Sequence, residues 1–88
     1  MGIFLKDIEL KGKTALITGA TKGIGRGTAI AIAQAGGNII AIGRNQKELE
    51  SLRKIIKKFR VKYTSFNCDV NNYESIKYFI SKLKKLDI

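Results

Sequence analysis

Three glycines, spaced Gly-x-x-x-Gly-x-Gly, form the most informative motif of this sequence. They lie in the segment Thr18-Gly19-Ala20-Thr21-Lys22-Gly23-Ile24-Gly25. A turn that leads from a strand into a helix directs backbone N–H groups, and the positive end of the helix dipole, at one spot that suits a pyrophosphate. Glycine is needed where a Cβ would block the ligand or strain the turn. The segment is not a P-loop, because no Gly-Lys-Ser/Thr closes it.

The neighbouring elements decide whether this segment binds a ligand or is only a tight structural turn. Residues 14–18 are a short apolar run with β-branched ends, which predicts a buried strand. Residues 24–35 are mostly Ala, Ile and Gly, which predicts a helix buried over much of its surface and ended by Gly36-Gly37. Residues 39–42 predict a second buried strand. A strand before the glycines and a helix after them favour the binding interpretation.

The rest of the chain continues the alternation. Asn45 with Glu48 three residues later predicts an N-cap. The helix that follows has one apolar face, formed by Leu49, Leu52, Ile55, Ile56 and Phe59. Residues 61–66 predict a third, weaker strand, and Asn71 with Glu74 repeats the capping pattern. The apolar face of the last helix is formed by Tyr73, Ile76, Ile80 and Leu83, and we expect Tyr73 to pack against Ile76 and Leu83. Residues 86–88 look like the start of another strand.

The order β-α-β-α-β-α predicts an α/β fold with three parallel strands, three helices and right-handed crossovers. The 88 residues allow one small domain.

With one cysteine, Cys68, and no histidine, the chain cannot form an internal disulfide and lacks the usual zinc ligands. We therefore expect no metal site and a reducing, cytoplasmic setting. No apolar run approaches the ~20 residues of a membrane span.

The net charge of +10 suggests a nucleic-acid-binding domain as one interpretation. A second interpretation is simpler, because most of the lysines fall on the polar sides of predicted helices, where they would form solvated faces. We therefore expect no membrane partner and consider nucleic acid an unlikely one.

The glycine segment resembles that of the short-chain dehydrogenase/reductase family. The preceding residues Leu10-Lys11-Gly12-Lys13-Thr14-Ala15-Leu16-Ile17-Thr18-Gly19 and the later Cys68-Asp69-Val70 also look like that family. The resemblance implies a doubly wound Rossmann sheet and a cofactor that is NAD or NADP. It implies that Gly19, Gly23 and Gly25, with Ile24, wrap the pyrophosphate. It also implies that Asp69 accepts a hydrogen bond from the adenine amino group, with Val70 beside it; a helix-entry turn residue is the alternative for Asp69.

The choice between NAD and NADP rests on the end of the second strand. An acidic residue there binds the ribose 2′-OH and repels a 2′-phosphate. Here that position is Gly43, followed by Arg44, and no carboxylate occurs from Gly19 to Lys47. Arg44 offers a fork of donors to a 2′-phosphate, and Lys22 could add a second charge. This favours NADP over NAD, the alternative being that both cations are solvated loop residues.

These inferences give one set of candidate cofactor-binding residues: Gly19, Thr21, Lys22, Gly23, Ile24, Gly25, Arg44, Asp69 and Val70. No catalytic residue is assigned. The family resemblance implies a Tyr-x-x-x-Lys pair with a Ser far downstream, and an Asn-Asn-Ala-Gly segment on the fourth strand. Tyr73 with Lys77, and Tyr78 with Lys82, match the spacing but lie on the third predicted helix, where any i, i+4 pair would do so.

We therefore expect residues 1–12 to be a lead-in and residues 13–88 to be the N-terminal half of an NAD(P)-binding Rossmann domain, truncated before the fourth strand. Alone it would not transfer hydride. Its first strand, central in the family fold, would be an exposed edge. That edge favours self-association or pairing with the C-terminal half of the same enzyme. The alternatives are a stand-alone nucleotide-binding or regulatory module and a basic nucleic-acid-interacting domain. The substrate stays open among sugars, keto-acyl compounds and steroid-like alcohols.

Overall fold

Three parallel strands form the sheet of this protein. A computed structural model describes residues 10–69 and 71–83 of the chain. The strands are β1 (Thr14–Thr18), β2 (Asn38–Gly43) and β3 (Tyr63–Asn67), paired in the order β1-β2-β3. In the register, Leu16 lies opposite Ile40, and Ile40 lies opposite Thr64. The predicted fold class, a partial Rossmann arrangement of three parallel strands with three helices, is confirmed.

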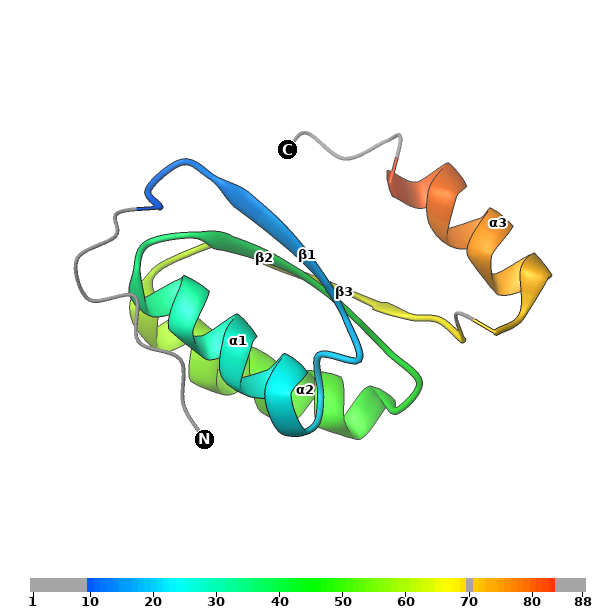
Figure 1. Ribbon diagram of the computed structural model, residues 1–88, viewed down its shortest axis with the longest axis horizontal. Helices are drawn as coiled ribbons and strands as arrows, with labels where there is room; N and C mark the ends of the chain where they lie inside the picture. The colour runs from blue at the N-terminus through cyan, green and yellow to red at the C-terminus, as the bar shows by residue number, and fades with distance from the viewer. Residues whose placement is uncertain (1–9, 70, 84–88) are drawn as a thin grey trace.

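Two helices cover one face of the sheet. They are α1 (Gly23–Gln34) and α2 (Gln46–Ile56), and the 3₁₀ turn η1 (Lys57–Phe59) continues α2. Figure 1 shows α1 and α2 side by side on the same face, with α3 (Tyr73–Leu83) set apart beyond the carboxyl end of β3. The residues expected at 86–88 as a further strand lie outside the described part of the chain.

The core lies between the sheet and these two helices. Ala29 and Ala33 of α1 are buried against β2, and their small side chains let the helix approach the strand closely. Leu49, Leu52 and Ile56 of α2 are 0% exposed, which confirms the apolar face predicted for that helix. Burial of this face removes apolar surface from water, and that removal is the main force that stabilises the fold.

The helix ends follow from local sequence. Gly36 has a φ of +94°, which an L side chain rarely adopts, and the amides of Gly36 and Gly37 donate to the carbonyls of Ala33 and Ile32. This left-handed C-terminal motif confirms the predicted end of α1. At the start of α2, the Asn45 side chain accepts a hydrogen bond from the Glu48 amide at 3.1 Å, as predicted.

The N-cap predicted for α3 is wrong by one residue. Asn72, not Asn71, caps the helix, and its Oδ1 accepts from the amides of Glu74 at 3.0 Å and Ser75 at 3.2 Å. The Asn71 amide instead donates to Oδ1 of Asp69 at 2.9 Å. This Asx turn takes up Asn71 and leaves Asn72 as the last residue before the helix.

The apolar face predicted for α3 is only partly covered. Tyr73 is 71% exposed, and the Lys77 ammonium lies 5.5 Å from the centre of its ring, so the prediction that Tyr73 packs on the apolar face is wrong. Ile80 is 45% exposed, whereas Ile76 is half-buried. The reason is the position of α3, which lies beyond the sheet rather than on it (Figure 1).

Strands β1 and β2 differ in how far their side chains are buried, although both were predicted to be buried strands. Residues 39–43 of β2 are all buried, because β2 lies between two strands. In β1, Leu16 is 46% exposed and Thr18 is exposed. The expected edge position of β1 is confirmed within the described sheet. The prediction that β1 is a buried strand is wrong, because no residue of Thr14–Thr18 is buried, and Ala15 and Ile17 are only partly buried against the core. Within residues 10–69 and 71–83, no helix combines the length and apolar character of a membrane span.

Candidate functional site

A cleft of about 490 Å³ opens at the carboxyl ends of the three strands. Parallel strands bring their carboxyl ends to one edge of a sheet, so three loops distant in sequence meet there. The loop after β1 contributes Gly19, the loop after β2 contributes Arg44, and the loop after β3 contributes Asp69. The lining residues are Gly19, Thr21, Lys22, Ile42, Gly43, Arg44, Asn45, Glu48, Cys68, Asp69 and Asn71.

The glycine turn takes a conformation that requires glycine at two positions. Gly19 has a φ of +61° and Gly23 a φ of +56°, both in the left-handed region. Gly25 has another role, because a Cβ there would overlap the carbonyl oxygen of Gly19. Gly25 therefore lets α1 start tight against the turn. The amide of Ala20 donates to the carbonyl of Ile42 at 3.2 Å, which ties the turn to the end of β2.

No side chain caps the N-terminus of α1. Lys22 occupies the N-cap position, makes no capping hydrogen bond with its side chain, and is followed by no acidic residue in the first turn. The first amides of a helix have no partner within it, so they can bind an anion. Ile24 is 80% exposed and, like Gly23 and Gly25, does not line the cleft.

Arg44 is the cation that follows β2. Its side chain is exposed, lines the cleft and forms no ion pair with any described carboxylate. Gly43 before it is tightly packed, because a Cβ there would lie 3.0 Å from the Thr21 methyl group and 3.4 Å from Cδ2 of Leu49, so a side chain would require Thr21 to shift. Arg44, the first residue after β2, is therefore the first side chain at this strand end that lines the cleft.

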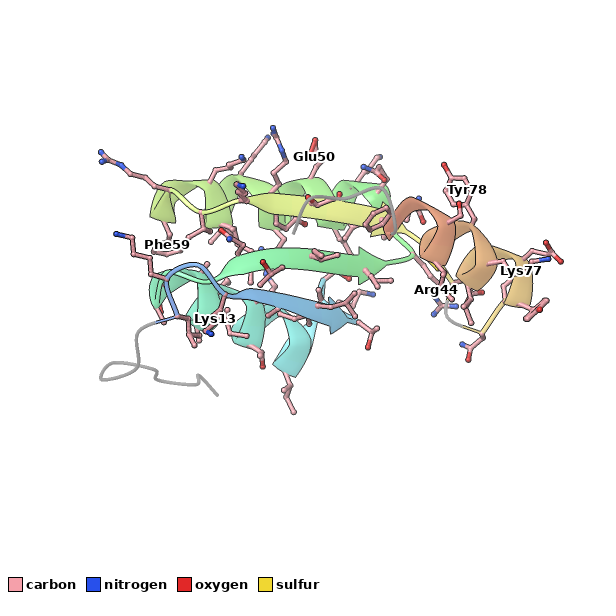
Figure 2. All side chains as sticks on the ribbon, turned by 90° about the horizontal axis from the view of Figure 1, so that it is seen from above. Lys13, Arg44, Glu50, Phe59, Lys77 and Tyr78 are labelled. Carbon is pink, nitrogen blue, oxygen red and sulfur yellow. The ribbon has the colours of Figure 1, made fainter. Side chains whose placement is uncertain are left out.

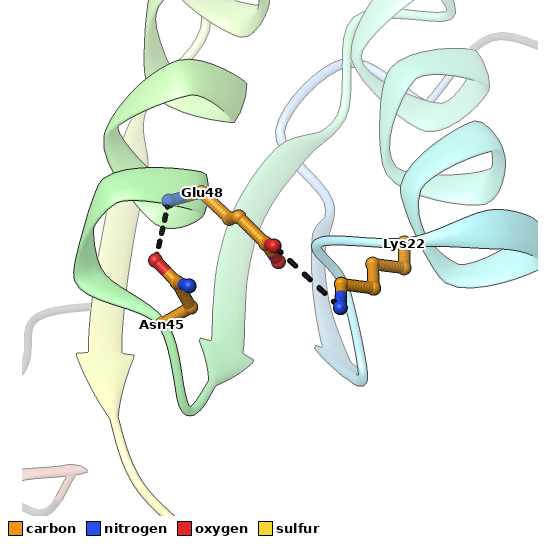
Figure 3. Close-up of polar contacts among 3 residues, drawn as sticks. All are labelled: Lys22, Asn45 and Glu48. Carbon is orange, nitrogen blue, oxygen red and sulfur yellow. Dashed lines mark hydrogen bonds and ion pairs between the residues drawn. The ribbon is translucent and has the colours of Figure 1, made fainter.

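Glu48 is a cleft residue that the sequence analysis did not identify. Its Oε1 lies 3.6 Å from Nζ of Lys22, so the N-terminal turns of α1 and α2 are joined by an ion pair (Figure 3). Glu48 is the first carboxylate after the carboxylate-free segment from Gly19 to Lys47. The signal was present, since the Asn45-Glu48 capping pattern places Glu48 in the first turn of α2, where it faces the turn after β1.

Asp69 serves the turn before α3 and also lines the cleft. Its Oδ1 accepts from the Asn71 amide, so the turn alternative for this residue describes a real contact. Beside it, Cys68 is 5% exposed, its amide donates to the carbonyl of Gly43 at 2.9 Å, and its thiol contacts the Ser75 carbonyl oxygen at 3.4 Å. Val70, predicted to lie beside the adenine, is outside the described residues.

The tyrosines of the two Tyr-x-x-x-Lys matches lie outside the cleft. Tyr73 and Tyr78 are 71% and 61% exposed on α3, and neither they nor Lys77 line the cleft. Figure 2 labels Tyr78 and Lys77 on α3 and Arg44 near the end of β2. The structure thus brings together Gly19, Thr21, Lys22, Arg44 and Asp69 of the predicted set, and does not bring Gly23, Ile24 or Gly25 into the cleft lining.

Known proteins share this arrangement. The short chain dehydrogenase family model matches residues 13–88. The 3-oxoacyl-(acyl-carrier-protein) reductase FabG of Rickettsia conorii is 42% identical over 81 residues, which cover 92% of this chain and 32% of that protein. This chain therefore spans about a third of the length of that relative.

Solved structures agree with the sequence relatives. L-sorbose reductase from Gluconobacter frateurii, complexed with NADPH and L-sorbose, superposes with a TM-score of 0.82 at 28% identity, covering 92% of this chain and 31% of that one. NAD⁺-bound xylitol dehydrogenase superposes with a TM-score of 0.78 at 30% identity, covering 84% and 28%. The glycine turn, the parallel sheet and these matches together show that the chain belongs to the short chain dehydrogenase family.

Proposed function

We propose that this chain binds NADP(H) in the cleft at the carboxyl ends of its strands, as the cofactor-binding part of a short chain dehydrogenase that transfers hydride between a nicotinamide and a carbonyl or alcohol. The observation that carries the proposal is that Arg44 and Lys22, the N-cap residue of the uncapped helix α1, line one cleft. In this proposal, residues 13–88 form the N-terminal half of an NAD(P)-binding Rossmann domain.

The candidate residues divide by the part of the cofactor that each would bind. The turn from Gly19 to Gly25 supplies backbone amides for the pyrophosphate. Asp69 and Val70 bind the adenine, and the Asp69 oxygen that is not used by the Asn71 amide can accept from its amino group. No cofactor chemistry is performed by these residues; they bind and orient the dinucleotide, whose nicotinamide supplies the hydride acceptor.

Arg44 supports NADP over NAD. A 2′-phosphate carries two negative charges that a guanidinium can bind through two parallel hydrogen bonds. The tight contact of Gly43 with Thr21 disfavours an acidic side chain at the end of β2, which is where NAD-binding domains of this kind hold the ribose. Structural relatives bound to NADPH and to NAD⁺ are both known, so the cofactor choice of this chain rests on its own residues.

Replacement of Arg44 tests the proposal. We expect Arg44→Ala to weaken NADP⁺ binding roughly 10- to 100-fold, the worth of a charge-assisted hydrogen bond, with little change for NAD⁺. Titration calorimetry of the 88-residue chain with each dinucleotide measures both dissociation constants. Lys54→Ala is the matched control, since it removes one positive charge from an exposed position outside the cleft. Equal NADP⁺ affinity before and after the Arg44 change would contradict the proposal.

The same preparations test the remaining parts of the proposal. With NADPH and a panel of carbonyl compounds we expect no oxidation of the cofactor, because the tyrosines of α3 lie outside the cleft. The edge position of β1 among the strands of residues 10–69 and 71–83, with the exposed Leu16, supports the expectation that the chain pairs with a second copy or with the remainder of a dehydrogenase domain. Sedimentation at several concentrations would reveal a second copy.

A further inference from the structure

An acidic side chain lies beside Lys22, the second cation that the cleft can offer to a 2′-phosphate. Glu48 and Lys22 both line the cleft, and Oε1 of Glu48 lies 3.6 Å from the Lys22 ammonium. The Lys22 side chain is 81% exposed and the Glu48 side chain 32% exposed, so the lysine can move more freely than the carboxylate. Figure 3 shows the Glu48 side chain extending from α2 toward Lys22.

The position of Glu48 is set by the helix rather than by the lysine. The Glu48 amide donates to the Asn45 side chain at 3.1 Å, which fixes the backbone of the first turn of α2. A carboxylate in a first helical turn is also favoured by the helix dipole. The backbone of Glu48 therefore does not depend on Lys22, and the negative charge of Glu48 stays at the first turn of α2 when Lys22 turns away.

A carboxylate in this cleft affects the binding of the two dinucleotides in opposite directions. A 2′-phosphate must separate Lys22 from Glu48 before it can bind the ammonium, and it is then repelled by the carboxylate. A free ribose 2′-OH can donate a hydrogen bond to a carboxylate, as it does to the acidic residue at the end of the second strand in NAD-binding domains. Gly43 occupies that strand position here, and Glu48 brings a carboxylate to the same cleft from the next helix.

We infer that Glu48 is a specificity-determining residue that lowers the affinity for NADP relative to NAD by holding Lys22 and by repelling the 2′-phosphate. The inference rests on the proposed dinucleotide site and deepens it. It makes the cofactor choice of the chain a balance, with Arg44 favouring NADP and Glu48 opposing it.

The test compares Glu48→Gln with a matched control. Glutamine keeps the length of the side chain and leaves the Asn45 cap intact, because that cap uses the backbone amide. Glu50→Gln removes the same charge from the same helix, but Glu50 lies outside the cleft and pairs with Arg53 at 4.0 Å. Calorimetric titration with NADP⁺ and with NAD⁺ gives the ratio of the two dissociation constants for each chain. Urea unfolding checks that each variant is folded.

We expect Glu48→Gln to tighten NADP⁺ binding about two- to fivefold, the range of a solvent-exposed ion pair, without tightening NAD⁺ binding. Glu50→Gln should leave the ratio unchanged. The inference alone is overturned if both dinucleotides bind and the ratio is the same in Glu48→Gln as in the unchanged chain, or if Glu50→Gln shifts it equally. If the unchanged, folded chain binds neither dinucleotide, the proposed function itself fails, and the inference fails with it.

A double-mutant cycle separates the two parts of the mechanism. In a Lys22→Gln background, Glu48→Gln no longer frees an ammonium, so its gain for NADP⁺ should shrink to the part that comes from direct repulsion. An undiminished gain would overturn the role assigned to the Lys22 contact.

Discussion

Helices α2 and α3 are built alike but are placed differently. Each has 11 residues, each begins after an asparagine whose side chain accepts from first-turn amides, and each has an apolar face by sequence. In α2 that face is fully buried, and Leu49, Leu52 and Ile56 are 0% exposed. In α3, Ile80 is 45% exposed and Tyr73 contacts Lys77 on the surface.

The difference shows that an apolar face on a helix indicates which side chains the helix can bury. Whether those side chains are buried depends on the elements that pack against the helix. Helix α2 lies against β2 and β3, which supply a matching apolar surface. Helix α3 lies beyond the carboxyl end of β3 (Figure 1). Hydrophobic stabilisation scales with the apolar area removed from water, so the two helices must contribute unequally to the free energy of unfolding.

The largest expected change in the free energy of unfolding comes from shortening a side chain on the buried face of α2. Leu52→Ala should lower the free energy of unfolding by about 2–5 kcal/mol, because it removes buried methyl groups and leaves a cavity. Ile80→Ala on α3 should cost less than about 1 kcal/mol. Urea denaturation followed by circular dichroism measures both. Similar losses for the two variants would mean that α3 has a buried face in solution, and the comparison would no longer hold.

The N-caps sharpen the comparison at a smaller scale. Asn45→Ala should lower the free energy of global unfolding by about 1 kcal/mol. Asn72→Ala removes a similar cap, but we expect faster amide exchange confined to α3, with the urea midpoint unchanged, because α3 can fray without opening the core. Asn71→Ala is the control and should leave the cap of α3 intact. Exchange in α3 accelerated by the Asn71 change, and not by the Asn72 change, would show the cap to be misassigned.

The contact between α2 and β3 contributes an effect that depends on pH. The Tyr63 hydroxyl donates to the Leu49 carbonyl at 2.8 Å, and burial, with a smaller contribution from Glu50, raises the pKa of Tyr63 to about 12 from 10.0. Tyr63→Phe should cost about 1 kcal/mol at neutral pH. Because the folded-state pKa is the higher one, this contribution is complete below pH 10 and is lost as the pH rises toward 12.

The measurement for Tyr63 is a series of urea unfolding curves from pH 7 upward on the unchanged chain and on Tyr63→Phe. The difference between the two chains isolates the contribution of the Tyr63 phenol from the contributions of all other groups. Tyr73→Phe is the control, since its ring is exposed. A stability difference that persists unchanged at pH 12 would show that ionisation of Tyr63 does not weaken the contact.

Much of the fold could be predicted from the sequence because its determinants are local. The strand at residues 14–18, the Gly36-Gly37 helix end and the Asn45 cap each depend on residues only a few positions apart, and all three are confirmed. The predicted burial of that strand depends on distant residues and is not confirmed. The glycine spacing likewise predicted the turn, because a positive φ at Gly19 and Gly23 is a property of the local backbone. The cap of α3 was misplaced because Asn71 and Asn72 are both suitable, and the Asp69 turn chooses between them.

Tertiary structure alone decided the contents of the cleft and the exposure of α3. The ion pair of Lys22 with Glu48 joins residues from different turns, and Gly43 is tight because Thr21 and Leu49 pack over it. No local pattern encodes these contacts, since they depend on how closely the first turns of α1 and α2 approach each other across the end of the sheet. By itself the sequence determined which residues could bind a dinucleotide, through backbone conformation and charge. The packing of the elements determined which of those charges face one another, because electrostatic and steric effects depend on distance in space rather than distance along the chain.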